Sequence, residues 1–197
     1  MDNSFPIPTD ILQRMVDAVE QVRRRLLRAS AALKAAGLPY AVVGGNAVAA
    51  WVATIDSAAV RNTQDVDVMI RRSDLAAVKA ALEAAGFVHR HAAGLDLFLD
   101  DAQANPRNAV HIIFSGELVR QGEPAPNPDI SESTDFDNFR VLNLMALVTI
   151  KLTAFRDKDR THLRDLIGVG LIDQTWTTRL PPVLASRLQQ LLDTPDG

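Results

Sequence analysis

The chain of 197 residues contains no cysteine, which excludes disulfide bonds and thiolate metal sites. It also lacks any apolar run long enough to cross a bilayer, so we expect no membrane partner. The first residues show neither the basic start nor the apolar core of a secretory signal. Missing cysteine does not identify a compartment, and cytoplasm is therefore the default prediction.

A strong positive charge is missing as well. The formal net charge is -3, whereas proteins that hold duplex DNA usually carry clustered basic surface. We therefore expect no broad DNA-binding surface. The apolar fraction of 47% is enough for a real core, and the length fits one large domain or one domain with a helical extension.

The most informative stretch present is a pair of aspartates, Asp65 and Asp67, at the start of an apolar strand. Side chains alternate along a strand, so the two carboxylates share one face and Val66, Val68 and Ile70 take the other. Adjacent carboxylates repel, and a divalent cation between them removes that cost. Hard oxygen ligands suit Mg²⁺ (or Mn²⁺), often together with phosphate oxygens. Such pairs also occur in turns, at strand ends and as surface charge.

Upstream, residues 40–52 predict a short strand, a tight glycine turn and a helix. Gly44 and Gly45 allow positive φ and a close approach of a ligand to the backbone. Asn46 is predicted to cap the helix, whose N-terminus favours phosphate. The alternative is a plain strand-to-helix connection that needs glycine for its turn.

These two motifs together resemble the nucleotidyltransferase superfamily with the DNA polymerase β-like fold. The resemblance rests on Val43-Gly-Gly-Asn46 and on the Arg61-x-Thr63-x-Asp65-x-Asp67 form, which is similar to minimal bacterial members that include AbiEii-like toxins. It implies a nucleoside triphosphate (NTP) substrate, with Asp65 and Asp67 as catalytic metal ligands. It further implies a nucleotide site that includes the glycine turn with Asn46, Arg61 and Thr63.

The third carboxylate that two-metal members of this superfamily carry has no counterpart on the expected strand. His111 stands in its place within 109–114. A neutral imidazole there could ligate a metal or act as a general base, so His111 is a catalytic candidate. The alternative is a hydrogen-bonded histidine on the sheet face. Asp96 and Asp100, on or after the preceding strand, are further candidates for the missing acid.

A second charged cluster follows an apolar helix near residue 151. Lys158, His162 and Asp165 share a helix face by their spacing, and the bland interpretation is a salt-bridged face between two helices. The resemblance instead implies that Lys151 contacts the triphosphate and Lys158 lies in the nucleotide site. It also implies that Asp165 helps to position the nucleotide or the acceptor.

The predicted fold class is α+β: a nucleotidyltransferase-like mixed β-sheet flanked by helices, with a helical C-terminal part. We expect a core at 1–142, with an N-terminal helix, and a helical subdomain at 143–197 packed on it. Predicted helices are 10–36, 46–55, 74–85, 143–156, 159–170 and 181–193, and predicted strands are 40–44, 65–70, 87–90, 95–99, 110–114 and 139–142, with a surface loop at 121–134. The first helix carries an apolar stripe of Ile11, Met15, Val19, Val22, Leu26 and Ala29.

The function these patterns predict is magnesium-dependent transfer of a nucleoside monophosphate from an NTP to a hydroxyl. The acceptor is open between tRNA, a protein and a small molecule. One alternative is an inactive nucleotide-binding or interaction module of the same fold. Another is a toxin with a cognate antitoxin, which differs from the first hypothesis in its acceptor.

Overall fold

The computed structural model describes residues 9–195, in which one mixed sheet of seven strands forms the centre of the molecule. The strand order is β3-β4-β5-β2-β1-β7-β6. The pairs β2–β5 and β1–β7 are parallel, and the other neighbours are antiparallel. The strands are β1 (Ala41–Val43), β2 (Val66–Ile70), β3 (Val88–Ala92), β4 (Leu95–Leu99), β5 (Ala109–Phe114), β6 (Ser133–Phe136) and β7 (Phe139–Leu142).

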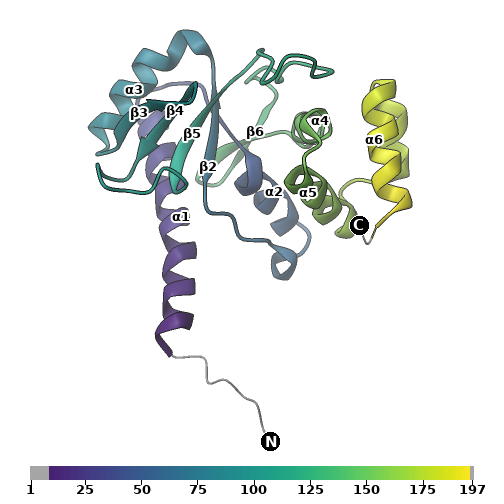
Figure 1. Cartoon of the computed structure of the whole chain (residues 1–197), viewed down its shortest axis with the longest axis horizontal. Helices are drawn as coiled ribbons and strands as arrows, with labels where there is room; N and C mark the ends of the chain where they lie inside the picture. The colour runs from purple at the N-terminus through teal and green to yellow at the C-terminus, as the bar shows by residue number, and fades with distance from the viewer. Residues whose placement is uncertain (1–8, 196–197) are drawn as a thin grey trace, which may run out of the picture.

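Helices flank this sheet, as Figure 1 shows, and α4, α5 and α6 lie together on the side away from α3. They are α1 (Thr9–Ala35), α2 (Gly44–Ala53), α3 (Leu75–Ala84), α4 (Leu144–Ala154), α5 (Asp157–Gly168) and α6 (Pro182–Asp193). Short 3₁₀ turns cover Ser57–Ala59, Arg72–Asp74 and Gln174–Arg179. Within residues 9–195, none of the helices combines the length and the apolar character needed to cross a membrane.

The middle of the sheet is apolar on both faces, which is why it is buried. All three residues of β1 are buried, and on β2 the side chains of Val66, Val68, Met69 and Ile70 are fully enclosed. Asp67 is the polar exception within β2. A charged side chain in the centre of such a sheet is costly without a partner, so its surroundings define the candidate site.

The order of elements that the sequence predicts is confirmed, and the α+β class is correct. Two local predictions are wrong. The first is the loop at 121–134, because its end forms the edge strand β6. The second is the cap at Asn46, because α2 begins at Gly44, directly after β1, and Val43 takes the cap position without a side-chain bond. Gly44 has φ +67°, which lets the chain turn without a connecting residue.

The apolar stripe of α1 is buried only in its second half. Leu26 and Ala29 pack in the core, whereas Ile11, Met15 and Val19 are 41%, 62% and 43% exposed. The reason is visible in Figure 1, where the first turns of α1 extend beyond the edge of the sheet. This leaves an apolar helix surface beside the loops that follow β4 and precede β2.

Candidate active site

Two carboxylates and one imidazole converge at the start of the paired strands β2 and β5. Asp65 directly precedes β2, and Asp67 lies one residue inside it. The parallel register places His111 of β5 opposite Asp67. One ligand atom from each of the three lies within 4.8 Å of the other two, and no other such group of acidic, histidine or cysteine side chains occurs between residues 9 and 195. The strand alternation that predicts a shared face for the acid pair therefore agrees with this geometry.

The orientation of His111 follows from its two ring nitrogens. Nε2 lies 3.1 Å from the backbone oxygen of Pro106, which can only accept a hydrogen bond, so Nε2 carries a proton. Nδ1 lies 3.6 Å from Asp67 Oδ1 and 3.9 Å from Asp65 Oδ2. In the neutral ring, Nδ1 therefore directs a lone pair between the carboxylates, as a metal-bound histidine does.

The side chains around this point favour a proton on the imidazole. The contact with Asp67 raises the pKa of His111 above its usual value, although burial opposes the shift. Burial is the largest single influence on Asp67 and would raise its pKa, but His111 and the nearby lysines together outweigh burial and the pKa is lowered. The positive charges of Lys158 and Lys151 act in the same direction. Asp67 is thus ionised and suited to hold a cation.

Positions 44 and 45 require glycine because Asp67 and the loop before β2 lie against the start of α2. A Cβ atom on Gly44 would lie 2.0 Å from Asp67 Oδ2, and one on Gly45 would lie 2.9 Å from the Thr63 side chain. Any side chain at Gly44 would therefore displace the carboxylate. The plain-turn alternative accounts for the positive φ of Gly44 but not for these close approaches.

Asp65 is held from two directions. The Thr63 hydroxyl donates a hydrogen bond of 2.8 Å to its Oδ1, and the Asn46 side chain donates one of 2.8 Å to its backbone oxygen. Asn46 thus connects α2 to the start of β2 and does not cap the helix. Both residues fix the carboxylate before any ligand arrives.

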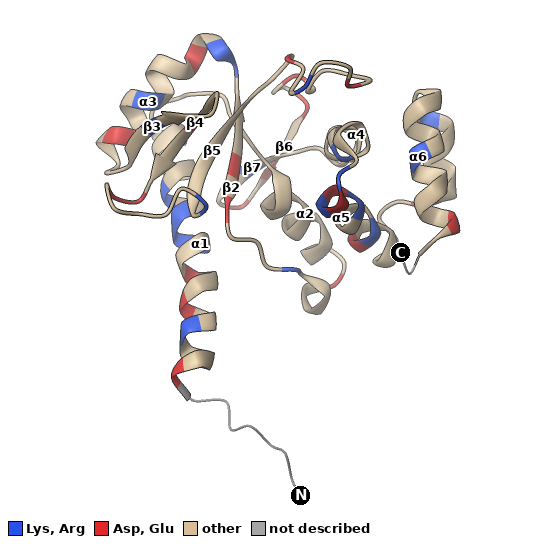
Figure 2. Ribbon diagram, viewed as in Figure 1, with Lys and Arg blue, Asp and Glu red and all other residues tan. Residues whose placement is uncertain are grey.

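An open cavity of about 380 Å³ lies in front of the acid pair. Six of the predicted site residues line it: Gly45, Thr63, Asp65, Asp67, His111 and Lys158. Figure 2 shows the acidic start of β2 facing the region of α5, where basic and acidic residues alternate. The cavity joins carboxylate and ammonium groups, which is an arrangement suited to a phosphate ligand with a metal ion.

Four residues that line this cavity were not predicted from sequence: Asn62, Gln64, Arg107 and His162. His162 carried a signal, since it lies one turn after Lys158 on the same face of α5. Burial, together with the positive charge of Lys151, lowers the pKa of His162 to about 4. Its Nδ1 atom is buried without a hydrogen-bond partner among the described residues. His162 is therefore a neutral ring at physiological pH.

Lys151 lies apart from the cavity lining. Its side chain is buried, and Nζ lies 3.2 Å from the Oδ1 atom of Asp159, which is fully buried. Arg156 Nε approaches the other oxygen of Asp159 at 2.7 Å. Lys151 acts on Asp67 through its charge. A direct phosphate contact by Lys151 stays a prediction.

Asp165 also has a protein partner. Arg61 Nε and Nη2 each donate a 3.0 Å hydrogen bond to its carboxylate. This bidentate pair joins the loop before β2 to α5 across the mouth of the site. Of the three residues predicted to share a face of this helix, Lys158 and His162 line the cavity. Asp165 instead binds Arg61 of the loop before β2.

Neither substitute for the third carboxylate is part of the metal-ligand group. Asp96 accepts contacts from His89 and His91 at 2.9 and 3.1 Å, and Asp100 pairs with Arg25 and Arg28. Both acids are occupied by basic groups elsewhere on the sheet, so the suggestion that one replaces the missing acid is wrong. The ligand set that fits a divalent cation is Asp65, Asp67 and His111, two hard oxygen donors with one imidazole.

A nucleotidyltransferase-like antigenic protein from Paracoccidioides brasiliensis supports the fold: it is 15% identical and aligns with 91% of each chain at a TM-score of 0.57. Two other solved structures are similar at lower TM-scores. A candidate nucleotidyltransferase from H. pylori is 14% identical over 96% of this chain and 80% of its own, with a TM-score of 0.49. The antibiotic-resistance factor ANT(2'')-Ia is 12% identical over 92% of each chain, with a TM-score of 0.49.

Among curated proteins, no match was found. A sequence profile for a family described as "Uncharacterised nucleotidyltransferase" matches residues 7–133, which include the glycine turn, the acid pair and His111. The matched segment spans more than half of the chain and all three residues of the candidate metal site. The chain therefore belongs to this nucleotidyltransferase family.

Proposed function

We propose that this protein transfers a nucleoside monophosphate from an NTP to a hydroxyl acceptor, with Mg²⁺ or Mn²⁺ held by Asp65, Asp67 and His111. The observation that carries the proposal is the convergence of these three side chains on one point beside the glycine turn. Family membership supports the reaction class, and the ligand set supports the metal.

One bond forms and one bond breaks in this reaction. The acceptor hydroxyl gives up its proton to solvent, its oxygen forms a bond to the α-phosphorus, and the bond from that phosphorus to the bridging oxygen breaks to release pyrophosphate. A divalent cation supplies charge neutralisation and lowers the barrier for the attacking oxygen. The remaining acceleration comes from holding the two reactants in line in a site with fixed charges.

The position of each residue around the cavity suggests its role in this reaction. Lys158 reaches the cavity and neutralises phosphate charge, while the backbone of Gly44 and Gly45 at the start of α2 faces the phosphates. Thr63 and Asn46 hold Asp65 in place. Arg61 and Asp165 fix the loop that carries Thr63, and Lys151 adds positive potential from behind α5.

Two finer predictions remain part of this proposal. The Arg61-x-Thr63-x-Asp65-x-Asp67 form resembles AbiEii-like toxins, which makes growth arrest on expression, relieved by Asp67→Ala or by a cognate antitoxin, the test of a toxin role. The division into a core at 1–142 and a helical part at 143–197, and the cytoplasm as compartment, are kept as predictions.

The decisive test uses Asp65→Asn. We expect it to abolish binding of a magnesium–NTP complex and the transfer of an α-phosphate label, because one of two carboxylate ligands is lost while the shape is kept. Asp137→Asn is the matched control, since Asp137 is an exposed aspartate in the β6–β7 turn. Equal binding and transfer by Asp65→Asn and the wild type would contradict the proposal.

A second candidate function, a nucleotide-binding module without chemistry, is favoured by one observation. The position opposite Asp67 on β5 holds His111, where two-metal relatives place an acid. His111→Ala separates the two candidates: an enzyme loses turnover while part of its NTP binding survives, and an inactive module has no turnover to lose.

A further inference from the structure

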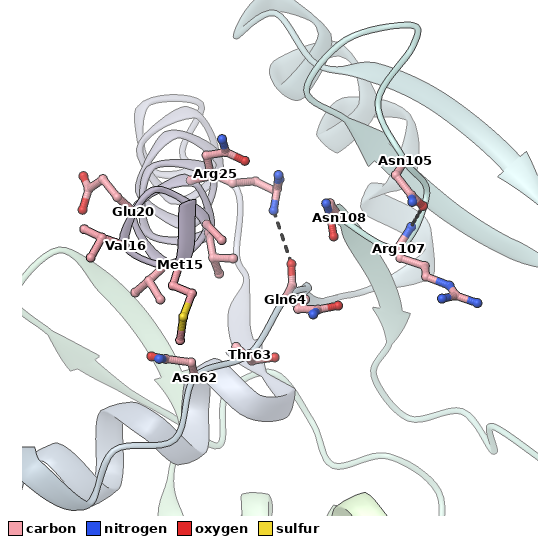
Figure 3. Close-up of a pocket in the computed structure, with 14 residues that line it drawn as sticks. Met15, Val16, Glu20, Arg25, Asn62, Thr63, Gln64, Asn105, Arg107 and Asn108 are labelled. Atoms are coloured by element: carbon pink, nitrogen blue, oxygen red, sulfur yellow. Dashed lines mark hydrogen bonds between the residues drawn. The ribbon is translucent and has the colours of Figure 1, made fainter. Parts of the chain in front are cut away.

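A second, larger cavity of about 850 Å³ adjoins the first. The loop residues Asn62, Thr63 and Gln64, together with Arg107, line both cavities. Figure 3 shows this space between α1, the loop before β2 and the β4–β5 loop. Its volume lies in the range of about 300–1,000 Å³ that small-molecule sites occupy. A molecule bound here would have its reactive group close to the acid pair.

The wall supplied by α1 is apolar. Met15, Val16, Val19 and Val22 line the cavity from this helix, and Figure 3 shows Met15 extending toward Asn62 and Thr63. Met15 and Val16 are each 62% exposed, so residues 9–195 do not cover them. Large apolar side chains left open beside a reaction site favour an apolar face on the ligand.

Apart from Arg107, the side chains of the opposite wall are polar and uncharged. Four carboxamide side chains line it: Asn62, Gln64, Asn105 and Asn108. Each offers both a donor and an acceptor, which suits hydroxyl and carbonyl groups of a ligand.

Two of the three charged side chains in the lining, Arg25 and Glu20, have protein partners, whereas Arg107 has no ion-pair partner among the described residues. Arg25 donates to Asp100 at 2.8 and 2.5 Å and to the backbone oxygen of Gln64 at 3.4 Å. Glu20 pairs with Arg23 at 3.2 Å. Arg107 lies where the two cavities meet, on the side of the phosphates. The part of the cavity lined by α1 therefore offers neither the cations that RNA requires nor the acids that a polycation requires.

We infer that this cavity is the acceptor site and that the acceptor is an uncharged, hydroxyl-bearing small molecule with one apolar face. The inference rests on the proposed function and narrows it, because it favours an uncharged small molecule over tRNA and over highly charged small molecules as the acceptor. The apolar face lies on α1, the hydroxyl groups bond to the carboxamides, and one hydroxyl reaches past Thr63 to the acid pair.

Three matched probes test the charge preference: n-hexyl β-D-glucopyranoside, hexyltrimethylammonium and hexyl sulfate, which share one alkyl tail. In NMR titrations of the full chain with magnesium and a non-hydrolysable NTP, we expect the neutral probe to bind saturably and at least fivefold more tightly than either ion. Equal or tighter binding of a charged probe would overturn the inference.

Substitutions on α1 test whether the glucoside binds in the larger cavity. Met15→Asp places a charge on the exposed apolar wall, and we expect at least tenfold weaker binding of the glucoside with unchanged magnesium–NTP binding. Val19→Asp serves the same purpose if Met15→Asp does not fold. Val183→Asp on α6 adds the same charge to another exposed apolar position and should leave glucoside binding unchanged. Glucoside binding that is insensitive to both α1 substitutions would refute the assignment.

The natural acceptor can be sought with an α-labelled NTP, magnesium and the RNA, protein and low-mass fractions of a lysate. Label on a low-mass acceptor that is uncharged before the transfer, reduced tenfold by Met15→Asp, supports the inference, and label in RNA or protein overturns it. Failure of the two proposals is distinguishable. If magnesium–NTP binding depends on Asp65 but Met15→Asp changes nothing, only the acceptor site is wrong. If the wild type binds no magnesium–NTP, the proposed function is wrong.

Discussion

This protein has two clusters of charged side chains around aspartates, one around Asp159 and one around Asp65 and Asp67, and the aspartate charge is balanced differently in each. Asp159 is fully buried and is met by Lys151 and Arg156. Asp65 and Asp67 form no ion pair with lysine or arginine in the described part of the chain, where His111 is the basic side chain nearest to them. In the first cluster, protein side chains alone balance the charge of Asp159. In the second cluster, they do not fully balance the charges of Asp65 and Asp67. Carboxylates that the fold leaves under-neutralised at a cavity indicate where a cation binds.

The two clusters are also coupled through space. Lys151 and Lys158 lower the pKa of Asp67, and Asp67 in turn raises the pKa of Arg156. The cluster around Asp159 therefore provides a fixed positive background for the open site. A background of this kind keeps an acid ionised without occupying its ligand positions.

The largest expected effect comes from breaking the closed cluster. Asp159→Ala should cost about 3–5 kcal/mol of unfolding free energy, because it leaves the buried ammonium of Lys151 without a partner. Denaturant unfolding of the variant measures this loss. The double variant Lys151→Met with Asp159→Leu should recover part of it. A single variant within about 1 kcal/mol of the wild type would mean that the two clusters do not differ as described.

The glycine contact gives the next largest effect. Gly44→Ala combines an unfavourable positive φ with a Cβ atom at 2.0 Å from Asp67 Oδ2, and we expect a loss of about 2–4 kcal/mol together with weaker metal binding. Gly37→Ala is the matched control, since Gly37 has φ +66° and no atom within 4 Å of an added Cβ. It should cost only about 1 kcal/mol. Equal losses would show that Asp67 can move away freely.

The stabilisation of the protein by a bound metal should depend on the cluster of Asp65 and Asp67 and not on the cluster of Asp159. At a Mn²⁺ or Mg²⁺ concentration 100 times the dissociation constant, the wild type should gain about 2.7 kcal/mol of stability. Asp65→Asn should lose this gain, because Asp65 is one of the ligands, and Asp159→Asn should keep it. Thermal unfolding with and without the metal measures both. Metal stabilisation that survives in Asp65→Asn would place the cation elsewhere.

The smallest expected effect concerns His162, whose charged form the folded protein disfavours. Its pKa is about 4 in the folded protein, against an ordinary value of 6.5. Above pH 6.5 the ring is neutral in both states and adds no pH dependence; as the pH falls from 6.5 toward 4, only the unfolded chain takes up the proton, so stability falls. Allowing for solvent around the partly exposed ring, the loss is roughly 1–2 kcal/mol.

His162→Gln should flatten this part of the stability curve between pH 4 and 6.5. Urea unfolding of both proteins at several pH values provides the measurement. An unchanged slope in the variant would assign the acid sensitivity to other groups. His91, a more exposed histidine on β3, offers the control substitution His91→Gln.

The sequence predicted those features that depend on local spacing. The alternation of a strand put Asp65 and Asp67 on one face, and the glycine turn was placed before a helix by its composition. The order of strands and helices followed from apolar periodicity. These signals are local, so neighbouring residues contain all the information that they need.

Other features depend on contacts between distant segments. The helix spacing associates His162 with Lys158, but nothing in the sequence indicates that Arg107 lines the same cavity, because the loop before β5 and α5 are far apart along the chain. Asn46 fitted a helix cap by type, yet the tight turn at Gly44 moved the helix start and freed its side chain for Asp65. Likewise, Asp96 and Asp100 are acids at suitable positions in the sequence. In the folded chain, however, Asp96 contacts His89 and Asp100 pairs with Arg25.

The hydrogen bond from His111 to the Pro106 backbone oxygen has a mechanical consequence. Pro106 belongs to the same short loop as Asn105 and Arg107, which border the larger cavity. A displacement of that loop would move the carbonyl that holds Nε2, and it would turn the lone pair of Nδ1 relative to the two carboxylates. A ligand that pressed on this loop from the larger cavity would therefore change the orientation of the imidazole.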